Sequence, residues 1–140
     1  MLLVDLIKSF KGDHALLHSV AGWEQILIDH VTIDSKKVGP TSLFVACKGV
    51  LPTSKNGHEF IDQAIAQGAA GILLQDPPEN ISQWTIPVWK SENTRRDAAR
   101  LAEIVWNRPA SQLTTIGITG TNGKSSVAFG LSSLLNALEI

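Results

Sequence analysis

A short glycine-rich loop near the C-terminal end of the sequence constrains the fold more than any other feature. The residues before it, 113–119, are apolar and rich in β-branched side chains, which predicts a strand. The loop itself consists of Gly120, Thr121, Asn122, Gly123, Lys124, Ser125 and Ser126. The residues that follow it recur at helical spacing and predict a helix: Val127, Leu131, Leu134, Leu135 and Leu138. A strand, a glycine loop and a helix in this order indicate an α/β fold.

The residue types of this loop suit it to bind phosphate groups. Its glycines allow several backbone N–H groups to converge on an anion at the positive end of the following helix. Lys124 can reach the β- and γ-phosphates of a nucleotide, and the hydroxyl of Ser125 can bind Mg²⁺. The strict form of the motif requires glycine at position 118, where this chain has Ile118. The alternative interpretation is therefore a glycine-rich turn that carries an exposed lysine.

The string Thr-Gly-Thr-Asn-Gly-Lys-Ser-Ser at residues 119–126 resembles the ATP loop of two enzyme families. These are the Mur ligases and the folylpolyglutamate synthases, which share this variant spacing. Both use ATP to convert a carboxylate into an acyl phosphate, which an amine then attacks. The resemblance implies that residues 120–126 bind the phosphates of ATP and that Ser125 binds magnesium.

The part of the chain before this loop also has an α/β pattern. Apolar patterning predicts strands within residues 24–33 and at residues 42–47, 71–74 and 86–89. It predicts helices at residues 2–10 and 59–67, and a third that starts at Thr94 with a capping-box-like Thr-x-x-Asp and ends before Pro109. We expect a domain boundary near Ser91, with domains at residues 1–91 and 92–140.

Several stretches of the first domain resemble the uridine-nucleotide domain of Mur ligases. They are residues 32–36, 39–40, 43–49, 56–61 and 64–70. The best match is the MurE type, which adds the third amino acid to UDP-N-acetylmuramoyl-L-Ala-D-Glu in peptidoglycan synthesis, and so serves cell-wall formation, cell shape and division. Folylpolyglutamate synthases lack such a domain. The resemblance implies a small α/β uridine-nucleotide domain followed by the first strand, loop and helix of a P-loop ATPase domain.

The same resemblance implies a set of substrate contacts in the first domain. The residues are Ile33, Ser35, Val50, Leu51 and Pro52. A serine at a strand end can bond a uracil or phosphate oxygen. Without the flanking resemblance blocks, Asp34 and Ser35 would instead be interpreted as the start of a turn that satisfies its own backbone. Lys36 stands where the family usually has arginine, Asn56 replaces a usual aspartate, and the connection between Gly49 and Asn56 is longer than the common form.

Composition excludes some other functions. Lys and Arg total 12 against 13 Asp and Glu, which argues against nucleic-acid binding through a basic excess. The single Cys47 cannot form an internal disulfide, which fits a reducing cytosol. No signal-peptide order and no apolar run of about 18 residues is present, so we expect a cytoplasmic protein without membrane insertion, and a monomer.

Mur ligases continue well beyond the glycine loop, so we expect this chain to be an amino-terminal part of such an enzyme. It should contain no catalytic residue and be inactive alone, although the parent is an ATP-dependent acid–amino-acid ligase. The alternatives are a fragment of a MurF-type ligase, a non-catalytic UDP-sugar-binding module, or an unrelated small P-loop protein such as a kinase. The third amino acid, whether diaminopimelate, lysine or another, is chosen by a C-terminal domain of the family.

Overall fold

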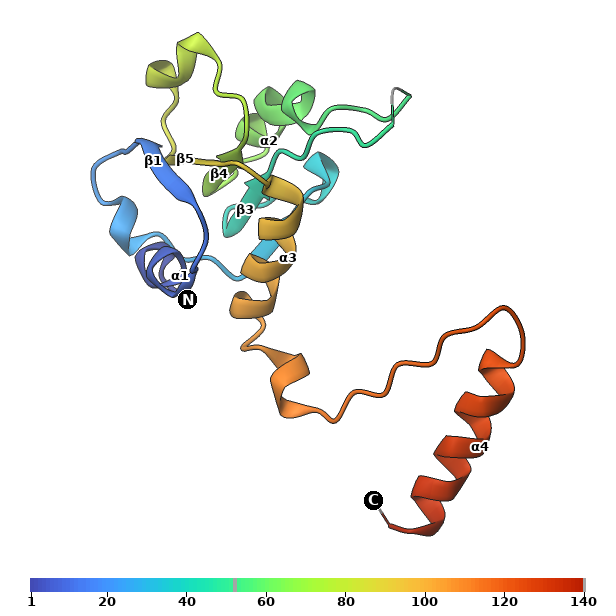
Figure 1. Ribbon diagram of the computed structural model, residues 1–140. Coiled ribbons are helices and arrows are strands. Elements are labelled where there is room, and N and C mark those ends of the chain that lie inside the picture. The colour runs from blue at the N-terminus through green and yellow to red at the C-terminus, as the bar shows by residue number, and fades with distance from the viewer. Residues whose placement is uncertain (52, 140) are drawn as a thin grey trace. The chain divides into compact units, whose positions relative to one another are not determined.

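The computed structural model describes residues 1–51 and 53–139 of the chain, which is drawn in Figure 1. The chain divides into two compact units, Met1–Pro109 and Ala110–Ile140. The first unit therefore extends beyond Ser91, where we expected a domain boundary. No helix in the described part of the chain is long and apolar enough to span a membrane.

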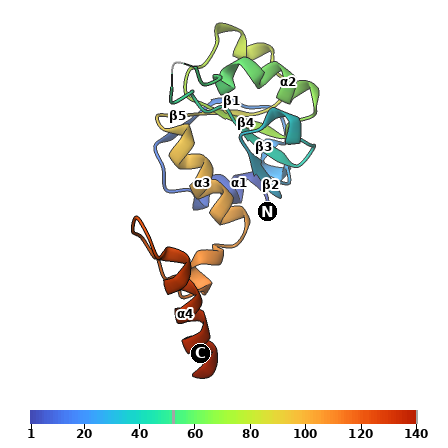
Figure 2. The same cartoon turned by 90° about the vertical axis from the view of Figure 1, so that its right-hand side faces the viewer.

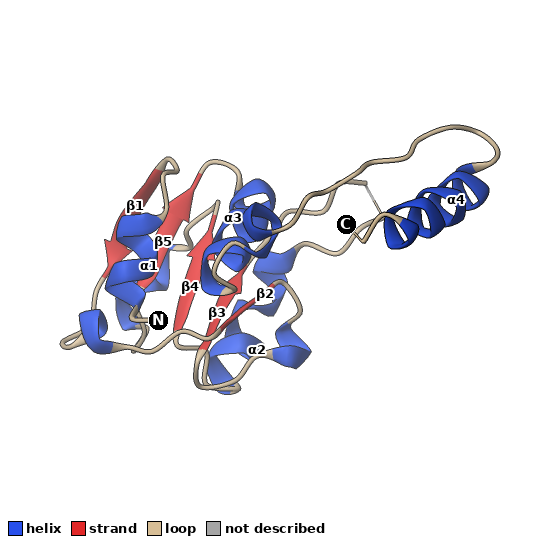
Figure 3. Ribbon diagram, turned by 90° about the horizontal axis from the view of Figure 1, so that it is seen from below, coloured by secondary structure: helices blue, strands red, loops and turns tan. Residues whose placement is uncertain are grey.

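The first unit is built on a single sheet, to which the described residues contribute five strands in the order β1-β5-β4-β3-β2. The strands are β1 (His14–His18), β2 (His30–Thr32), β3 (Ser42–Val45), β4 (Gly71–Leu74) and β5 (Val88–Ser91). Strands β2 to β5 are parallel, and β1 pairs antiparallel with β5 at one edge, as Figure 3 shows. The expected α/β class is thus confirmed.

Helices cover both faces of this sheet. The first unit contains α1 (Leu3–Ser9), α2 (Ile61–Ala66) and α3 (Thr94–Val105), and the 3-10 helices η1 (Trp23–Gln25), η2 (Ser35–Lys37), η3 (Gly57–Phe60) and η4 (Glu79–Gln83). Figure 2 shows α1 and α3 on one side of the strands and α2 on the other. A fifth 3-10 helix, η5 (Pro109–Gln112), begins at the end of the first unit, and the second unit contains α4 (Lys124–Ala137).

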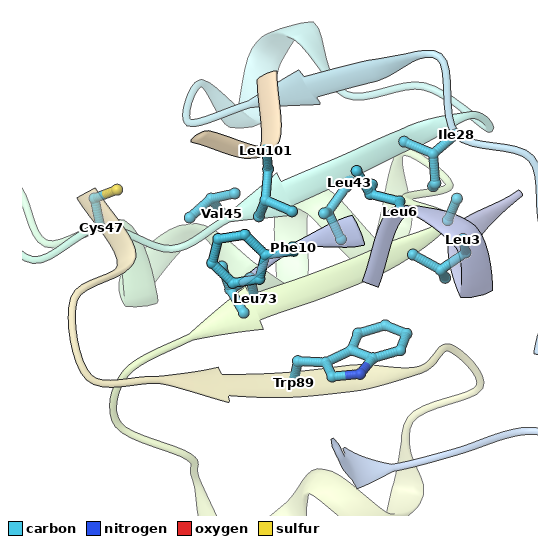
Figure 4. Close-up of a cluster of buried hydrophobic side chains, with 11 residues drawn as sticks. Leu3, Leu6, Phe10, Ile28, Leu43, Val45, Cys47, Leu73, Trp89 and Leu101 are labelled. Carbon is cyan, nitrogen blue, oxygen red and sulfur yellow. The ribbon is translucent and has the colours of Figure 1, made fainter. Parts of the chain in front are cut away.

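Alternating side chains of the central strands form two apolar clusters. Leu43 and Val45 of β3 face α1 and α3 and pack with Leu101 of α3, as Figure 4 shows. Phe44, between them in sequence, lies in the other cluster with Ile61 of α2. Every residue of β3 and of β4 is buried. Parallel strands covered on both faces form continuous apolar runs, which is why the patterning of residues 42–47 and 71–74 predicted them correctly.

Strands near the edges of the sheet follow the predictions less closely. Residues 24–33 contain only the short β2, preceded by η1, and β5 begins two residues after the predicted start at Ile86. Edge strand β1 was not predicted, because most of its side chains are exposed and its apolar residues do not alternate with polar ones. Residues 113–119 form no strand, so that prediction is wrong. A strand requires a hydrogen-bonded neighbour, and no strand of the described residues pairs with this segment.

Helix α3 is joined to β5 by a buried carboxylate. Asp97 is fully buried and accepts hydrogen bonds from Ser91 Oγ at 2.5 Å and from Arg96 Nε at 2.9 Å. The cap of α3 is Asn93, whose side chain accepts from the backbone N–H of Arg96 at 3.0 Å, so the predicted Thr94–Asp97 capping box is wrong. These contacts hold α3 against β5 within the first unit.

Candidate functional site

A cleft of about 370 Å³ lies at the carboxyl end of β2 in the first unit. Its walls are formed by Ile33, Asp34, Ser35, Lys36, Lys55 and Phe60. Two of the five predicted substrate contacts, Ile33 and Ser35, are among them. Ligands of open α/β sheets commonly bind beyond the carboxyl ends of parallel strands, where connecting loops meet.

One wall of the cleft is shaped by the chain that leaves β2. The carboxylate of Asp34 accepts from the N–H of Lys36 at 3.0 Å and caps η2. Asp34 therefore does form the turn that we considered as its alternative role. Ser35 is buried, and its hydroxyl donates to Oε1 of Gln63 in α2 at 3.0 Å. The hydroxyl oxygen of Ser35 can still accept a hydrogen bond from a ligand.

The other wall is apolar and aromatic, and it carries a cation. Lys55 precedes η3, and its Nζ lies 5.7 Å from the ring centroid of Phe60, at the end of η3. Ile33 is 54% exposed on the first wall. The cleft thus combines apolar surface with two lysines, Lys36 and Lys55, an arrangement suited to a planar ligand that carries negative charge.

Two predicted contacts do not line this cleft. Val50 and Leu51 are 72% and 64% exposed. The N–H of Leu51 donates to Ser54 Oγ at 3.2 Å, and Ser54 N–H donates to the carbonyl of Leu51 at 2.9 Å. Leu51 is therefore held by a local contact with Ser54, and Val50 precedes it in the chain. Pro52 lies outside the described residues.

Lys55 and Phe60 were not predicted as site residues. Lys55 and Phe60 lie 20 and 25 positions after Ser35, and only the tertiary fold brings them to the end of β2. A signal was available in the resemblance blocks, because Phe60 belongs to residues 56–61 and Lys55 lies next to them. Lys55 also ends the connection that is longer than the common form.

The glycine loop of the second unit has the backbone geometry that its glycines predict. Gly120 and Gly123 have φ of +148° and +76°, conformations that residues with a side chain rarely adopt. Gly123 is the N-cap of α4, and its carbonyl accepts from the N–H of Val127 at 3.0 Å. The N–H groups of the first turn of α4 therefore begin immediately after the loop.

The start of α4 carries one ammonium group and two hydroxyl groups, the side-chain types that bind phosphate and magnesium. Lys124 Nζ donates to the carbonyl of Gly120 at 2.5 Å, so its ammonium lies across the loop. Ser125 and Ser126 are exposed in the first turn of α4. The described residues contain no group of three or more His, Cys, Asp or Glu side chains able to hold a metal ion.

Comparison with known proteins gives consistent results for sequence and fold. The Mur ligase family, catalytic domain, matches residues 27–118, which include every residue that lines the cleft and end just before the glycine loop. The UDP-N-acetylmuramoyl-L-alanyl-D-glutamate--2,6-diaminopimelate ligase of Alkaliphilus metalliredigens is 38% identical over 121 residues, which cover 86% of this chain and 23% of the relative. The corresponding L-lysine ligase of Staphylococcus haemolyticus is 38% identical over 112 residues, 78% of this chain and 21% of the relative.

A solved structure shares the fold. It is the UDP-N-acetylmuramoylalanyl-D-glutamyl-2,6-diaminopimelate--D-alanyl-D-alanyl ligase of Acinetobacter baumannii, with a TM-score of 0.61 and 24% identity over 95% of this chain and 27% of that one. The chain thus spans about a quarter of the length of the proteins it matches. Because the family match covers more than half of its residues, this chain belongs to the Mur ligase family.

Proposed function

We propose that this chain binds the uridine nucleotide and the ATP phosphates for a ligase that adds the third residue to UDP-N-acetylmuramoyl-L-Ala-D-Glu. The observation that carries the proposal is the cleft of Ser35, Lys36, Lys55 and Phe60, in a chain whose relatives are named for this substrate. The third residue is diaminopimelate or L-lysine in the names of those relatives.

The walls of the cleft offer complementary contacts to a uridine diphosphate. The ring of Phe60 and the side chain of Ile33 provide apolar surface for a base. The Ser35 hydroxyl, which donates to Gln63, can accept the N–H of uracil. Lys36 and Lys55 can neutralise the diphosphate, although as point charges they lack the two-pronged geometry of arginine.

The second unit supplies a site for the phosphates of ATP. The N–H groups at the start of α4 and the ammonium of Lys124 attract the anion, and Ser125 can hold magnesium. Magnesium supplies charge neutralisation to the phosphates when it is bound. The reaction class is activation of the substrate carboxylate as an acyl phosphate, followed by attack of an amine. It belongs to peptidoglycan synthesis, in the cytoplasm.

The names of the relatives favour this reaction over the addition of D-alanyl-D-alanine. The Acinetobacter baumannii enzyme that shares the fold is named for the addition of D-alanyl-D-alanine. At 24% identity, this similarity supports the fold and not the substrate. The relatives at 38% identity are named for addition to UDP-N-acetylmuramoyl-L-alanyl-D-glutamate. The fold therefore leaves the substrate open, and the sequence comparison supports the dipeptide.

The proposal is tested by calorimetric titration of the 140-residue chain with UDP-N-acetylmuramoyl-L-Ala-D-Glu. We expect saturable binding that Ser35→Ala weakens, because that variant loses the acceptor in the cleft. Ser82→Ala is the matched control, since Ser82 is exposed in η4 and does not line the cleft. Absence of binding by a chain whose fold is intact by circular dichroism would refute the proposal.

A further inference from the structure

Helix η3 carries one wall of the cleft and is held at the ends of two neighbouring strands. The N–H of Gly57 donates to the carbonyl of Cys47, just after β3, at 2.8 Å. A Cβ atom on Gly57 would lie 2.7 Å from the N and O atoms of Cys47, so this approach requires glycine. The second attachment is made by His58.

The imidazole of His58 makes hydrogen bonds with both ring nitrogens. Its Nε2 accepts from the backbone N–H groups of Gln75 and Asp76, just after β4, each at 3.1 Å. Its Nδ1 lies 2.8 Å from Oδ1 of Asn56, which also accepts from the N–H of His58 at 3.2 Å. Because both partners of Nε2 are donors, Nε2 carries no proton, and the ring is neutral with its proton on Nδ1.

The residues on either side of His58 line the cleft. Lys55 lies three positions before it and Phe60 two positions after it. No atom of His58 itself is among the cleft walls. The hydrogen bonds from Gln75 and Asp76 therefore attach η3, which ends at Phe60, to the end of β4. This makes His58 a positioning residue, not a ligand.

We propose that neutral His58 fixes the cleft wall formed by Lys55 and Phe60 to the end of β4, and that protonation of His58 releases this wall and weakens nucleotide binding. The second half of this inference rests on the proposed function, since it assumes that the cleft takes a uridine nucleotide. The first half depends only on the hydrogen bonds.

Protonation of His58 removes the hydrogen-bond acceptor at Nε2. An imidazolium has an N–H at that position, which would point at the N–H groups of Gln75 and Asp76 and leave them without their acceptor. The pKa of His58 is lowered, first by burial and then by Lys48, while Asp76 acts in the opposite direction. The neutral form is therefore favoured in the folded chain, as the two accepted hydrogen bonds require.

The charged groups around His58 define the pH range of the effect. Lys48 Nζ lies 2.7 Å from Oδ2 of Asp76, and this contact lowers the pKa of Asp76, which stays ionised in mild acid. A histidine whose folded pKa lies below its ordinary value of about 6.5 contributes its full stabilisation above that value. The stabilisation is then lost as the pH falls towards the lowered pKa. Nucleotide affinity should fall over the same range.

Substitution by glutamine separates a positioning role from a merely structural one. In His58→Gln, the amide oxygen can take the place of Nε2 and accept both N–H groups, but it does not titrate. We expect this variant to bind UDP at neutral pH about as well as the unchanged chain and to keep its affinity in acid. His58→Ala should bind weakly at both pH values. His14→Gln in β1 is the matched control and should keep the pH dependence of the unchanged chain.

Two measurements on the 140-residue chain make the test. UDP affinity is measured by NMR titration at about pH 7.5 and about pH 5, and we expect the unchanged chain to bind more weakly at the lower pH. Without ligand, the exchange protection of the Gln75 and Asp76 amides, corrected for the intrinsic effect of pH, should fall over the same range. Equal protection at both pH values, or a His58→Gln variant with the pH dependence of the unchanged chain, would overturn the inference. If UDP fails to bind anywhere, the proposed function fails, and amide protection still decides the role of His58.

Discussion

The cleft of the first unit and the glycine loop of the second are held in place in different ways. The cleft depends on residues far apart in sequence, joined by contacts such as Ser35 to Gln63 and His58 to the end of β4. The loop depends on neighbours, namely the positive φ of Gly123 and the contact of Lys124 with Gly120. A site made by local geometry can be predicted from its sequence, whereas a site made by packing requires the fold.

The two units also differ in how much of their apolar side chains is buried. In the first unit Leu43, Phe44 and Leu101 are fully buried. Helix α4 has no buried residue, and Val127 and Phe129 are 57% and 77% exposed. Truncation of an apolar side chain should therefore lower the stability of the first unit more than that of the second. Substitution of a glycine should change stability through steric contact in the first unit and through helix propensity in the second.

The largest expected difference is between Leu101→Ala and Leu134→Ala. Leu101 is fully buried between α3 and the sheet, so its truncation should cost about 2–5 kcal/mol of unfolding free energy. Leu134 is 56% exposed, and its truncation should change stability by less than about 0.5 kcal/mol. Urea unfolding followed by tryptophan fluorescence reports on the first unit, since all the tryptophans lie there. Equal shifts for the two variants would show that α3 does not belong to the core of the first unit.

The success of the fold prediction also varied with burial. β4 was predicted with its observed bounds because its residues are apolar and enclosed on both faces. β1 was missed because Leu16 and Leu17 are adjacent and both exposed, so they have no periodicity that indicates a strand. Residues 113–119 have strand-like composition without a partner, and propensity alone does not make a strand.

The cleft could be predicted only in part. Ser35 was selected from its resemblance block, and the structure places it in the cleft. Lys55 and Phe60 were missed because their position depends on the attachment of η3 to the ends of β3 and β4, which no local pattern contains. Val50 and Leu51 were selected by resemblance, but neither lines the cleft, and Leu51 is hydrogen-bonded to Ser54 instead.

Two glycines, Gly57 in η3 and Gly130 in α4, should respond in opposite ways to substitution by alanine. Gly57→Ala would bring a Cβ to 2.7 Å from the backbone of Cys47, so we expect it to destabilise the first unit by about 1–3 kcal/mol. Gly130, inside α4, has open space around its Cβ position, and Gly130→Ala should favour the helix by about 1 kcal/mol. Tryptophan fluorescence measures the first effect, and Cα chemical shifts of α4 measure the second. A neutral Gly57→Ala would mean that η3 does not rest on Cys47.

The smallest expected difference between the two units comes from single lysines of the two sites. Lys55→Ala should weaken UDP binding and leave ATP binding unchanged, whereas Lys124→Ala should do the reverse. Each lysine is exposed, so we expect losses of only about 0.5–1.5 kcal/mol, which diminish as salt is added. Calorimetry with UDP and with magnesium ATP checks both. If either variant weakened both ligands equally, the two sites would not be independent.

The central claim is that the cleft at the end of β2, and not the glycine loop, receives the uridine nucleotide. The most direct test is amide chemical-shift mapping of the ¹⁵N-labelled 140-residue chain during titration with UDP-N-acetylmuramoyl-L-Ala-D-Glu. We predict the largest shifts at Ile33, Ser35, Lys55 and Phe60, while the amides of residues 120–126 respond only to magnesium ATP. Uridine-nucleotide shifts centred on residues 120–126, with Ser35 and Phe60 unmoved, would contradict the account.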